Sequence, residues 1–482
     1  MLLQIHEPNK TPQTDATVGI DFGTTNSVVA HMVDGTPRII SIDKTRLIPS
    51  VVAYDKGEAT FGCKARESKN AIASIKRCME PDFKGPYSTS VKTASSEDEF
   101  VRFAVDDKLL SPVDIVRDFL KYLRQKTKAA LNQPVYQAVL TVPAYYTERA
   151  RHATRKAAID AGIRVLRLLN EPTAAALAYR LDEKRDGHYL VYDLGGGTFD
   201  VSLLYSEKGI FQVLAVGGDT QLGGDDVDMA VGQYLMETFD IKDQTVARKF
   251  GKEIKEYLGE NALWSGTIEE KSVTVSQDTL IELVTPFIKK TFDLCTATLA
   301  DAGISKERLK NIVFVGGSTR LASLKARAET FFGQRPLCTL NPNEVVAMGA
   351  AMQAEALVFG KGKLLIDVTP YPLGIETLGG ATEVLIPKNA ALPCVMSQSF
   401  TTSLDNQKRI KIHILQGEAN HVSECKSLTS FVLSGIPDMP AGVPDVQVSF
   451  TLDADGILLV EAVERKTGVK QTVHVQDALI SY

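Results

Sequence analysis

The spacing of apolar residues along the chain changes near residue 361. Before that point, β-branched apolar runs alternate with stretches of helical period, an arrangement typical of an α/β domain. One helix is predicted to begin where Ser111 can cap it and Pro112 suits its first position. The apolar residues that follow at helical spacing are Ile115, Val116, Phe119, Leu120 and Leu123. They predict one buried helix face, and the Ala-rich stretch Glu148–Ala161 predicts a second helix that ends at Gly162.

After residue 370 the period of the apolar residues becomes two. Alternation over 408–415 (KRIKIHIL) and 446–452 (VQVSFTL) predicts strands with one buried face, and Asp455-Gly456 signals a hairpin turn. The C-terminal region is therefore expected to form a compact antiparallel β-domain. The segment between the two regions, 362–370 (GKLLIDVTP), is apolar, whereas a passive linker would be polar and rich in Gly and Ser. We therefore expect this linker to dock against a domain.

The composition narrows the class of protein. A chain of 482 residues suggests roughly three packing units. Its 54 basic and 59 acidic side chains leave a formal charge of −5, which argues against binding to nucleic acid or to anionic lipid. No apolar run is long enough to span a membrane, and the N-terminal apolar stretch is too short for a signal peptide. The six cysteines include no CxxC pair, which argues against zinc and favours the reducing cytoplasm as the location.

Two segments of the α/β region share one pattern. Residues 18–27 (VGIDFGTTNS) and 188–204 (HYLVYDLGGGTFDVSLL) each contain a β-branched strand, an Asp at its end, a Gly-rich turn with Thr, and a second strand. This repeat predicts a duplicated domain with a cleft between its halves. A Gly-rich turn lets backbone N–H groups come close to phosphate oxygens. The residues that the two turns offer are Gly23, Thr24, Thr25, Asn26, Gly195, Gly196, Gly197 and Thr198.

Acidic residues flank both turns. Asp21, Asp193 and Asp200 are placed to hold Mg²⁺ through water, with Asp21 and Asp193 as the predicted metal-binding pair. A single Gly-rich turn can be no more than a tight turn, but two matched copies with flanking acids favour binding of nucleotide phosphates. Neither is a Walker A loop, because no GKS or GKT follows. A third strand and turn, 311–320 (NIVFVGGSTR), offers a Gly-Gly turn that can lie beneath an adenosine.

Further segments resemble the DnaK-type heat-shock chaperones of the seventy-kilodalton class. They are TVPAYY (141–146), NEPTAAALAY (170–179), VGGSTR (315–320), LLIDVTP (364–370) and LGIETLGG (373–380). The resemblance, which covers about residues 17–470 in family order, implies an α/β actin-like ATPase domain (ribonuclease H-like, duplicated) followed by an antiparallel β-sandwich that holds an extended peptide. The implied boundaries are an N-terminal tail 1–16, the nucleotide-binding domain 17–361, the interdomain linker 362–370 and the peptide-binding sandwich 371–482.

The resemblance also implies slow hydrolysis of ATP to ADP and phosphate with Mg²⁺. The residues implied to carry catalysis are Lys76, Glu171, Asp193, Thr198 and Asp200. Among them, Lys76 would orient the attacking water and bring positive charge to the phosphoryl group. The implied γ-phosphate contacts are Thr24, Thr25 and Thr198, and the implied adenosine contacts are Lys255, Gly316, Gly317, Ser318 and Arg320. Lys252 and Gly259 stand where the family usually has Glu and Ser, so altered purine contacts are expected.

Coupling, partner and peptide residues are implied in the same way. The coupling residues are Pro143, Arg151, Leu364, Leu365 and Asp367. Of these, Pro143 resembles a switch and Arg151 its relay. A J-domain cochaperone would face Arg167, Asn170 and Thr173. The peptide groove would contain Ile375, Leu378, Phe400, Ser403, Ile410 and Ile412. The alternative for the apolar members of this set is a place in the sandwich core.

Several segments resemble the HscA branch, which serves iron–sulphur cluster assembly. They are LLQIHEP (2–8), the short segment WSGTIEEKSVTV (264–275), QGE (416–418), GIP (435–437) and KTG (466–468). This branch implies an iron–sulphur scaffold protein as client. The family's helical lid would follow VQDALISY, so a shortened form or a fragment with faster peptide exchange is expected.

Other interpretations remain open. A general DnaK-like folding chaperone shares most of these motifs. An actin-like small-molecule kinase would share both phosphate turns but has no use for a β-domain over 371–470. The missing lid, together with Lys252 and Gly259 on the helix expected to contact the purine, suggests either a peptide-binding module that needs no nucleotide or a lidless fragment with an uncoupled ATPase. We expect instead that ATP docks the linker and the β-domain, and that hydrolysis releases both and tightens peptide binding. Because coupling is reciprocal, peptide and J-domain should both raise hydrolysis.

Overall fold

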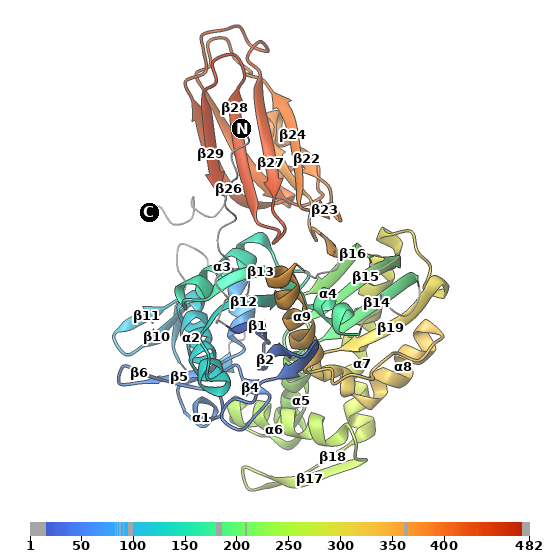
Figure 1. Cartoon of the computed structure of the whole chain (residues 1–482). Helices are drawn as coiled ribbons and strands as arrows, with labels where there is room; N and C mark the ends of the chain where they lie inside the picture. The colour runs from blue at the N-terminus through green and yellow to red at the C-terminus, as the bar shows by residue number, and fades with distance from the viewer. Residues whose placement is uncertain are drawn as a thin grey trace, which may run out of the picture.

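The computed structural model describes residues 16–474, apart from 82, 84, 86–87, 90, 95–99, 180–185, 208–209 and 361–364. A larger α/β domain carries an elongated β-domain, which stands above it in Figure 1. The predicted N-terminal tail 1–16 lies outside the described residues except for Ala16, which already begins strand β1 (Ala16–Asp21). Within the described ranges, no helix is long and apolar enough to span a membrane.

The first half of the α/β domain is built on one mixed sheet. Its strand order is β13-β12-β1-β2-β3, with β1 parallel to β12 and antiparallel to β2. The bounds are β2 (Asn26–Val33), β3 (Thr36–Ile39), β12 (Val135–Val142) and β13 (Arg164–Asn170), with β4 (Ile48–Pro49) paired to β2. Helices α2 (Pro112–Leu131) and α3 (Glu148–Asp160) cover one face of the sheet, and α9 (Val345–Phe359) covers the other.

The second half repeats this plan. Its strands run in the order β19-β14-β15-β16, with β14 parallel to β19 and antiparallel to β15. The bounds are β14 (Gly187–Leu194), β15 (Phe199–Glu207), β16 (Ile210–Asp219) and β19 (Leu309–Val315). The helices that share a core with one face are α5 (Gly224–Phe239), α6 (Gln244–Leu258), α7 (Gln277–Asp301) and α8 (Ala322–Phe332). Helices α4 (Glu171–Ala178) and α9 pack on the other face, so the predicted repeat corresponds to the two antiparallel pairs β1–β2 and β14–β15.

Smaller elements extend both halves. One group is β5 (Val52–Asp55), β6 (Glu58–Phe61), α1 (Cys63–Arg66), β7 (Ala71–Ala73) and β8 (Ser88–Thr89). A second is β9 (Thr93–Ala94), β10 (Arg102–Val105) and β11 (Lys108–Leu110). In the second half, β17 (Leu263–Ile268) and β18 (Lys271–Ser276) form a hairpin.

The two helices expected from the sequence are confirmed. Ser111 caps α2: its hydroxyl accepts a hydrogen bond from the Asp114 amide (3.2 Å), and the Asp114 carboxylate accepts one from the Ser111 amide (3.0 Å). The buried positions of α2 include the five apolar residues that the spacing indicated. Helix α3 ends at Asp160, one residue before the expected end.

The β-domain is a sandwich of two four-stranded sheets. Their strand orders are β22-β21-β25-β26 and β24-β27-β28-β29. The bounds are β21 (Leu373–Glu376), β22 (Thr382–Ile386), β24 (Cys394–Phe400), β25 (Arg409–Gln416), β26 (Lys426–Ser434), β27 (Val446–Leu452), β28 (Leu458–Glu464) and β29 (Lys470–His474). The two strands expected from the alternation are confirmed as β25 and β27, whose inward residues join one core. The predicted hairpin turn joins β27 to β28, and Gly456 in it has a φ of 75°, which glycine adopts without strain.

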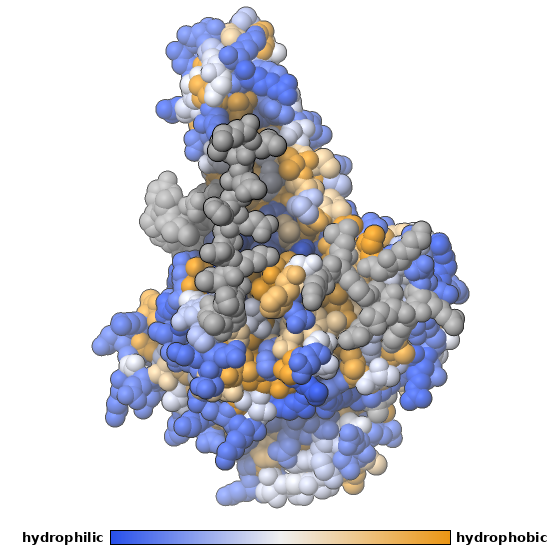
Figure 2. Space-filling view, in the orientation of Figure 1, coloured by the Kyte–Doolittle hydropathy of each residue, from blue (hydrophilic) through white to orange (hydrophobic). Residues whose placement is uncertain are grey.

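The linker forms a strand of the second α/β sheet. Strand β20 (Leu365–Val368) pairs in parallel with β16 and pairs in antiparallel fashion with β23 (Ala391–Leu392) of the β-domain. Leu365 is buried, so the linker docks as its composition predicted, whereas Leu364 lies outside the described residues. On the face seen in Figure 2, apolar residues gather where the β-domain meets the α/β domain.

Candidate functional site

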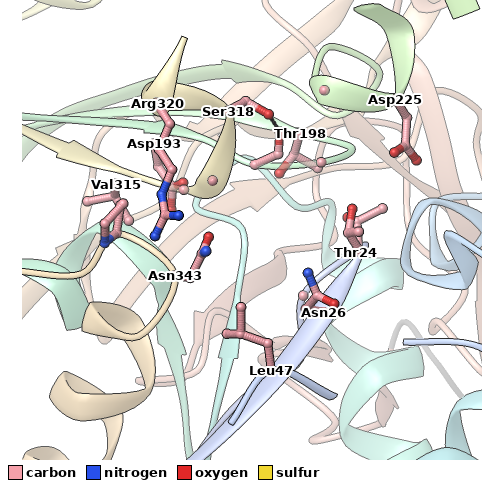
Figure 3. A pocket seen from close by; sticks show the side chains of 18 of the residues that line it. Thr24, Asn26, Leu47, Asp193, Thr198, Asp225, Val315, Ser318, Arg320 and Asn343 are labelled. Carbon is pink, nitrogen blue, oxygen red and sulfur yellow. Dashed lines mark hydrogen bonds between the residues drawn. The ribbon is translucent and has the colours of Figure 1, made fainter. Parts of the chain in front are cut away.

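A cavity of about 470 Å³ lies between the two halves of the α/β domain. The two Gly-rich turns line it from opposite sides, and Figure 3 shows Thr24 and Asn26 facing Thr198 and Ser318. The predicted residues in its lining are Asp21, Gly23, Thr24, Thr25, Asn26, Lys76, Glu171, Asp193, Gly195, Gly196, Thr198, Lys255, Gly316, Gly317, Ser318 and Arg320. Gly197 and Asp200 are buried outside this lining. The structure therefore brings together nearly all of the residues predicted to contact nucleotide.

Glycine is required where the two turns meet. A Cβ at Gly196 would lie 2.0 Å from Oγ1 of Thr25, and a Cβ at Gly197 would lie 2.6 Å from Cγ2 of Thr24. A larger residue at either position would displace the threonine side chain that it faces, so the close approach of the two turns depends on glycine. A phosphate chain in this space would meet hydroxyl and N–H groups from both halves.

Several carboxylates surround the ammonium of Lys76. This residue lies on the short 3₁₀ helix Ile75–Met79 and forms a buried ion pair with Glu171, the first residue of α4. Burial lowers the pKa of Lys76, but the charges of Glu171 and Asp21 more than offset it, so the pKa lies above its usual value. Lys76 therefore keeps its positive charge at neutral pH.

The neighbouring acids hold their protons more tightly than usual. Burial, and after it the charge of Glu171, raises the pKa of Asp21 to about 7. The same two causes raise the pKa of Asp200 to about 7, although the Tyr145 amide donates a hydrogen bond to it (2.9 Å) and lowers the pKa. Burial and the charge of Glu171 also raise the pKa of Asp193 well above its usual value. The negative charge around Lys76 exceeds what one ammonium balances, so the site suits a divalent cation.

The side chains fit a cation held through water. In the part of the chain that the structure describes, no group of three or more His, Cys, Asp or Glu residues is arranged to coordinate a metal directly. Asp21 and Asp193 both line the cavity, and their charge suits Mg²⁺ that keeps several of its waters. These two residues would hold the ion, and the ion would supply positive charge for the phosphates.

The far end of the cavity contains the residues predicted for the purine. On α6, Lys255 forms an ion pair with Asp228 (2.5 Å), so its ammonium is oriented by the protein. Arg320 lines the cavity after β19. Lys252 and Gly259 also line it, so both departures from the family pattern fall on the site itself.

The sequence did not predict the polar contacts that join the two halves of the α/β domain. The Ser74 hydroxyl donates to Oδ2 of Asp225 (2.5 Å), and Nη2 of Arg77 lies 2.5 Å from Oδ2 of Asp226. Both bonds join the first half to the start of α5. The available signal was the segment 223–226 (GGDD), two glycines followed by acids, but nothing in the sequence pairs it with residues 74 and 77.

The turn after β12, residues 143–147, lies between the cavity and the β-domain. Arg151 donates to the carbonyl of Ala144 (3.1 Å) and to Oδ1 of Asn170 (2.6 Å). Its other terminal nitrogen donates to the carbonyl of Asp455 in the β27–β28 turn (3.5 Å). Pro143 and Arg151, predicted as a switch and its relay, therefore lie together where the two domains meet.

The β27–β28 turn makes further contacts with the α/β domain. Oδ1 of Asp455 accepts a hydrogen bond from the Leu168 amide (3.0 Å), and Oδ2 lies 3.3 Å from Nη1 of Arg155. On the linker, Asp367 accepts a hydrogen bond from the Thr173 hydroxyl (3.2 Å). The docked arrangement is thus held by polar groups on both the linker and the sandwich.

The residues predicted to face a J-domain take part in this interface. Arg167 is half-buried and donates to the carbonyl of Ala454 (3.4 Å). Asn170 and Thr173 are buried. Direct contact of a partner with Asn170 or Thr173 would require the linker to move, so this role stays a prediction for an undocked form.

Residues 17–479 match the family model described as Hsp70 protein. The chain belongs to the Hsp70 family. It is 41% identical over 500 residues to "Chaperone protein HscA homolog" of Acinetobacter baumannii (strain AYE), a match that covers 98% of this chain and 80% of that protein. The protein of the same name from Polynucleobacter asymbioticus is 42% identical over 510 residues (98% and 81% covered). That from Haemophilus influenzae (strain 86-028NP) is 40% identical over 496 residues (98% and 80% covered).

Membership of the Hsp70 family makes the chain a DnaK-type chaperone of HscA-like sequence. Hsp70 chaperones are ATPases that use ATP and ADP with Mg²⁺. The cavity between the two halves, with its phosphate turns and acidic cluster, is the candidate nucleotide site of this Hsp70 chain.

The residues predicted for the peptide groove of this Hsp70 chain divide into two groups. Ile375 and Ile412 are buried in the core between the two sheets, as the alternative interpretation allowed. Phe400 and Ile410 are partly buried and pack against the same core. Leu378, by contrast, is 85% exposed, and Ser403 is exposed as well. In this arrangement Leu378 and Ser403 are free to touch a peptide, whereas Ile375 and Ile412 would reach it only if the sandwich opened.

Proposed function

We propose that this chain is an ATP-driven chaperone in which slow hydrolysis of ATP to ADP and phosphate gates the binding of an extended client peptide. One observation carries the proposal: strand β20 pairs with β16 of the α/β domain and with β23 of the β-domain. This one apolar strand therefore joins the sheet that carries the second Gly-rich turn, residues 195–198, to the sandwich. A nucleotide that shifts the two halves would act on the β-domain through this hydrogen-bonded sheet.

Hydrolysis would take place beside Lys76. Its ammonium places positive charge where negative charge develops on the phosphoryl group. Asp200, whose pKa burial and the charge of Glu171 raise to about 7, can accept a proton from the attacking water near neutral pH. Bound Mg²⁺ would supply further positive charge. Because ATP serves as a timer for peptide release, slow turnover suits the task.

Gating requires more than the linker. Moving a population from 1:99 to 99:1 takes about 5.5 kcal/mol of differential binding. Burial of Leu365 contributes about 1.5–3 kcal/mol. Two hydrogen bonds to carboxylates contribute about 1.5–3 kcal/mol each. Asp367 accepts one from Thr173, and Asp455 accepts the other from the Leu168 amide. The linker and the β27–β28 turn together therefore reach the size that the switch requires.

We infer that the client is an iron–sulphur scaffold protein and that the chain serves iron–sulphur cluster assembly in the cytoplasm. The HscA resemblance of the sequence is matched by the names of its relatives, "Chaperone protein HscA homolog". A J-domain cochaperone would be the second partner. Leu378 and Ser403, both exposed, would form an arch over an extended segment of the client.

ATP turnover by the purified chain tests this proposal. Turnover is measured for the chain alone, with an unrelated extended apolar peptide, and with a scaffold-protein peptide plus a J-domain protein. We expect a slow basal rate and a marked increase with the scaffold peptide and the J-domain. Equal stimulation by the unrelated peptide would favour a general DnaK-like folding chaperone. A rate that no peptide changes would indicate an ATPase uncoupled from its sandwich.

A further inference from the structure

Tyr145 places its backbone between the nucleotide site and the β-domain. On the side of the nucleotide site, its amide donates a hydrogen bond to Oδ1 of Asp200 (2.9 Å). Asp200 pairs with Gly218 of β16, and a Cβ at Gly218 would lie 3.1 Å from the Tyr145 Cβ. Because glycine stands at this position, Tyr145 has room to lie directly beside Asp200.

On the other side, Tyr145 contacts the entrance of the sandwich. Tyr371 lies between β20 and β21, where the linker enters the β-domain. Its hydroxyl donates a hydrogen bond to the carbonyl of Tyr145 (3.2 Å), and the two rings lie 4.6 Å apart between centroids at an angle of 52°. Burial raises the pKa of Tyr371 above its usual value. The phenol therefore keeps its proton and remains a hydrogen-bond donor near neutral pH.

We propose that Tyr371 is a positioning residue that transmits docking of the β-domain to Asp200 through the backbone of Tyr145. The carbonyl and the amide involved belong to the same residue, so fixing the carbonyl restricts the orientation of the amide. The inference rests on the proposed function, because it names the contact through which docking acts on hydrolysis. Neither the motifs of the sequence nor the predicted switch at Pro143 and Arg151 includes Tyr371.

The direction of the effect follows from the hydrogen bond on Asp200. In the docked form, the Tyr145 amide occupies one carboxylate oxygen of Asp200, which fixes the orientation of this side chain and makes that oxygen less accessible to the attacking water. Undocking removes the bond from Tyr371, and the turn at Tyr145 can then relax away from Asp200. Tyr371 therefore restrains hydrolysis until a client peptide releases the β-domain.

The test compares Tyr371→Phe with Tyr371→Ala in the full chain. The Phe variant keeps the ring and loses only the hydroxyl, whereas the Ala variant also loses the ring contact. Three quantities are measured in Mg-ATP: turnover with and without an extended apolar peptide, ATP affinity, and hydrogen exchange of the linker amides 365–368. Tyr54→Phe is the matched control, since it removes a tyrosine hydrogen bond to Asp118 (3.1 Å) in the first half, away from the interface.

For Tyr371→Phe we expect basal turnover to rise about two- to fivefold and linker exchange to rise by a smaller factor, with peptide-stimulated turnover and ATP affinity unchanged. Tyr371→Ala should raise basal turnover and also speed linker exchange, and Tyr54→Phe should match the wild type. A Phe variant with wild-type basal turnover would overturn the role of the hydroxyl. A Phe variant whose basal turnover rises by no more than its linker exchange would show that Tyr371 acts only by holding the domains together, which also overturns the inference. If peptide does not stimulate the wild type, the proposed function itself fails.

Discussion

Removal of the Asp455 carboxylate should release the β-domain from the α/β domain. In Asp455→Ala the Leu168 amide loses its acceptor (3.0 Å), and an unsatisfied buried donor costs about 1–3 kcal/mol. The ion pair with Arg155 adds about 0–1 kcal/mol, because the Arg155 side chain is one-third exposed (33%). The sum, about 1–4 kcal/mol, lowers the ratio of docked to undocked chain by about 5- to 900-fold. Asp455→Asn keeps a carbonyl oxygen for the Leu168 amide, so its effect should be below about tenfold.

Hydrogen exchange of the linker amides 365–368 in Mg-ATP measures this ratio. Exchange should be fastest in Asp455→Ala, intermediate in Asp455→Asn and slowest in the wild type. Asp445→Ala is the matched control, because Asp445 pairs with Arg465 (3.5 Å) within the sandwich and away from the interface. Equal exchange in the Ala and Asn variants would show that the charge of Asp455, rather than its bond to the Leu168 amide, holds the domains. Unchanged exchange in both would refute the docking argument.

Three further substitutions test the separate parts of the account. Lys76→Ala should abolish hydrolysis, but nucleotide should still bind because many other groups line the cavity. Unchanged turnover in a phosphate-release assay would contradict the role of Lys76. Leu378→Ala should weaken peptide binding about tenfold without altering basal turnover, and equal affinity by anisotropy would remove Leu378 from the groove. Leu365→Asp would bury a charge where the linker docks, so it should uncouple the two domains. If peptide still stimulates ATP turnover in this variant, the linker does not couple the domains.

Features set by local sequence were predictable. The cap at Ser111, the apolar face of α2 and the hairpin at Gly456 depend on residues within a few positions of one another. The cavity between the two halves was also predictable, because each Gly-rich turn carries its own local pattern and the repeat indicates that two halves face each other. The motif resemblance then supplied Lys76 and Glu171, which are distant in sequence yet form an ion pair.

Contacts between distant segments were not predictable. The bond from Ser74 to Asp225 joins positions 151 residues apart, and no periodicity or motif relates them. The bond from Tyr371 to Tyr145 spans 226 positions and depends on how the sandwich docks. Alternation places Ile412 on the inner face of its strand, but it cannot distinguish a core residue from one that lines a groove, and the structure places Ile412 in the core.

The affinity of an extended apolar peptide in Mg-ATP and in Mg-ADP tests the central claim most directly. Fluorescence anisotropy of a labelled peptide with the purified chain gives both the affinity and the rate of release. Coupling through β20 predicts weaker binding and faster release in Mg-ATP than in Mg-ADP. Equal affinity and equal release rates in the two nucleotides would contradict the claim that ATP hydrolysis gates the sandwich.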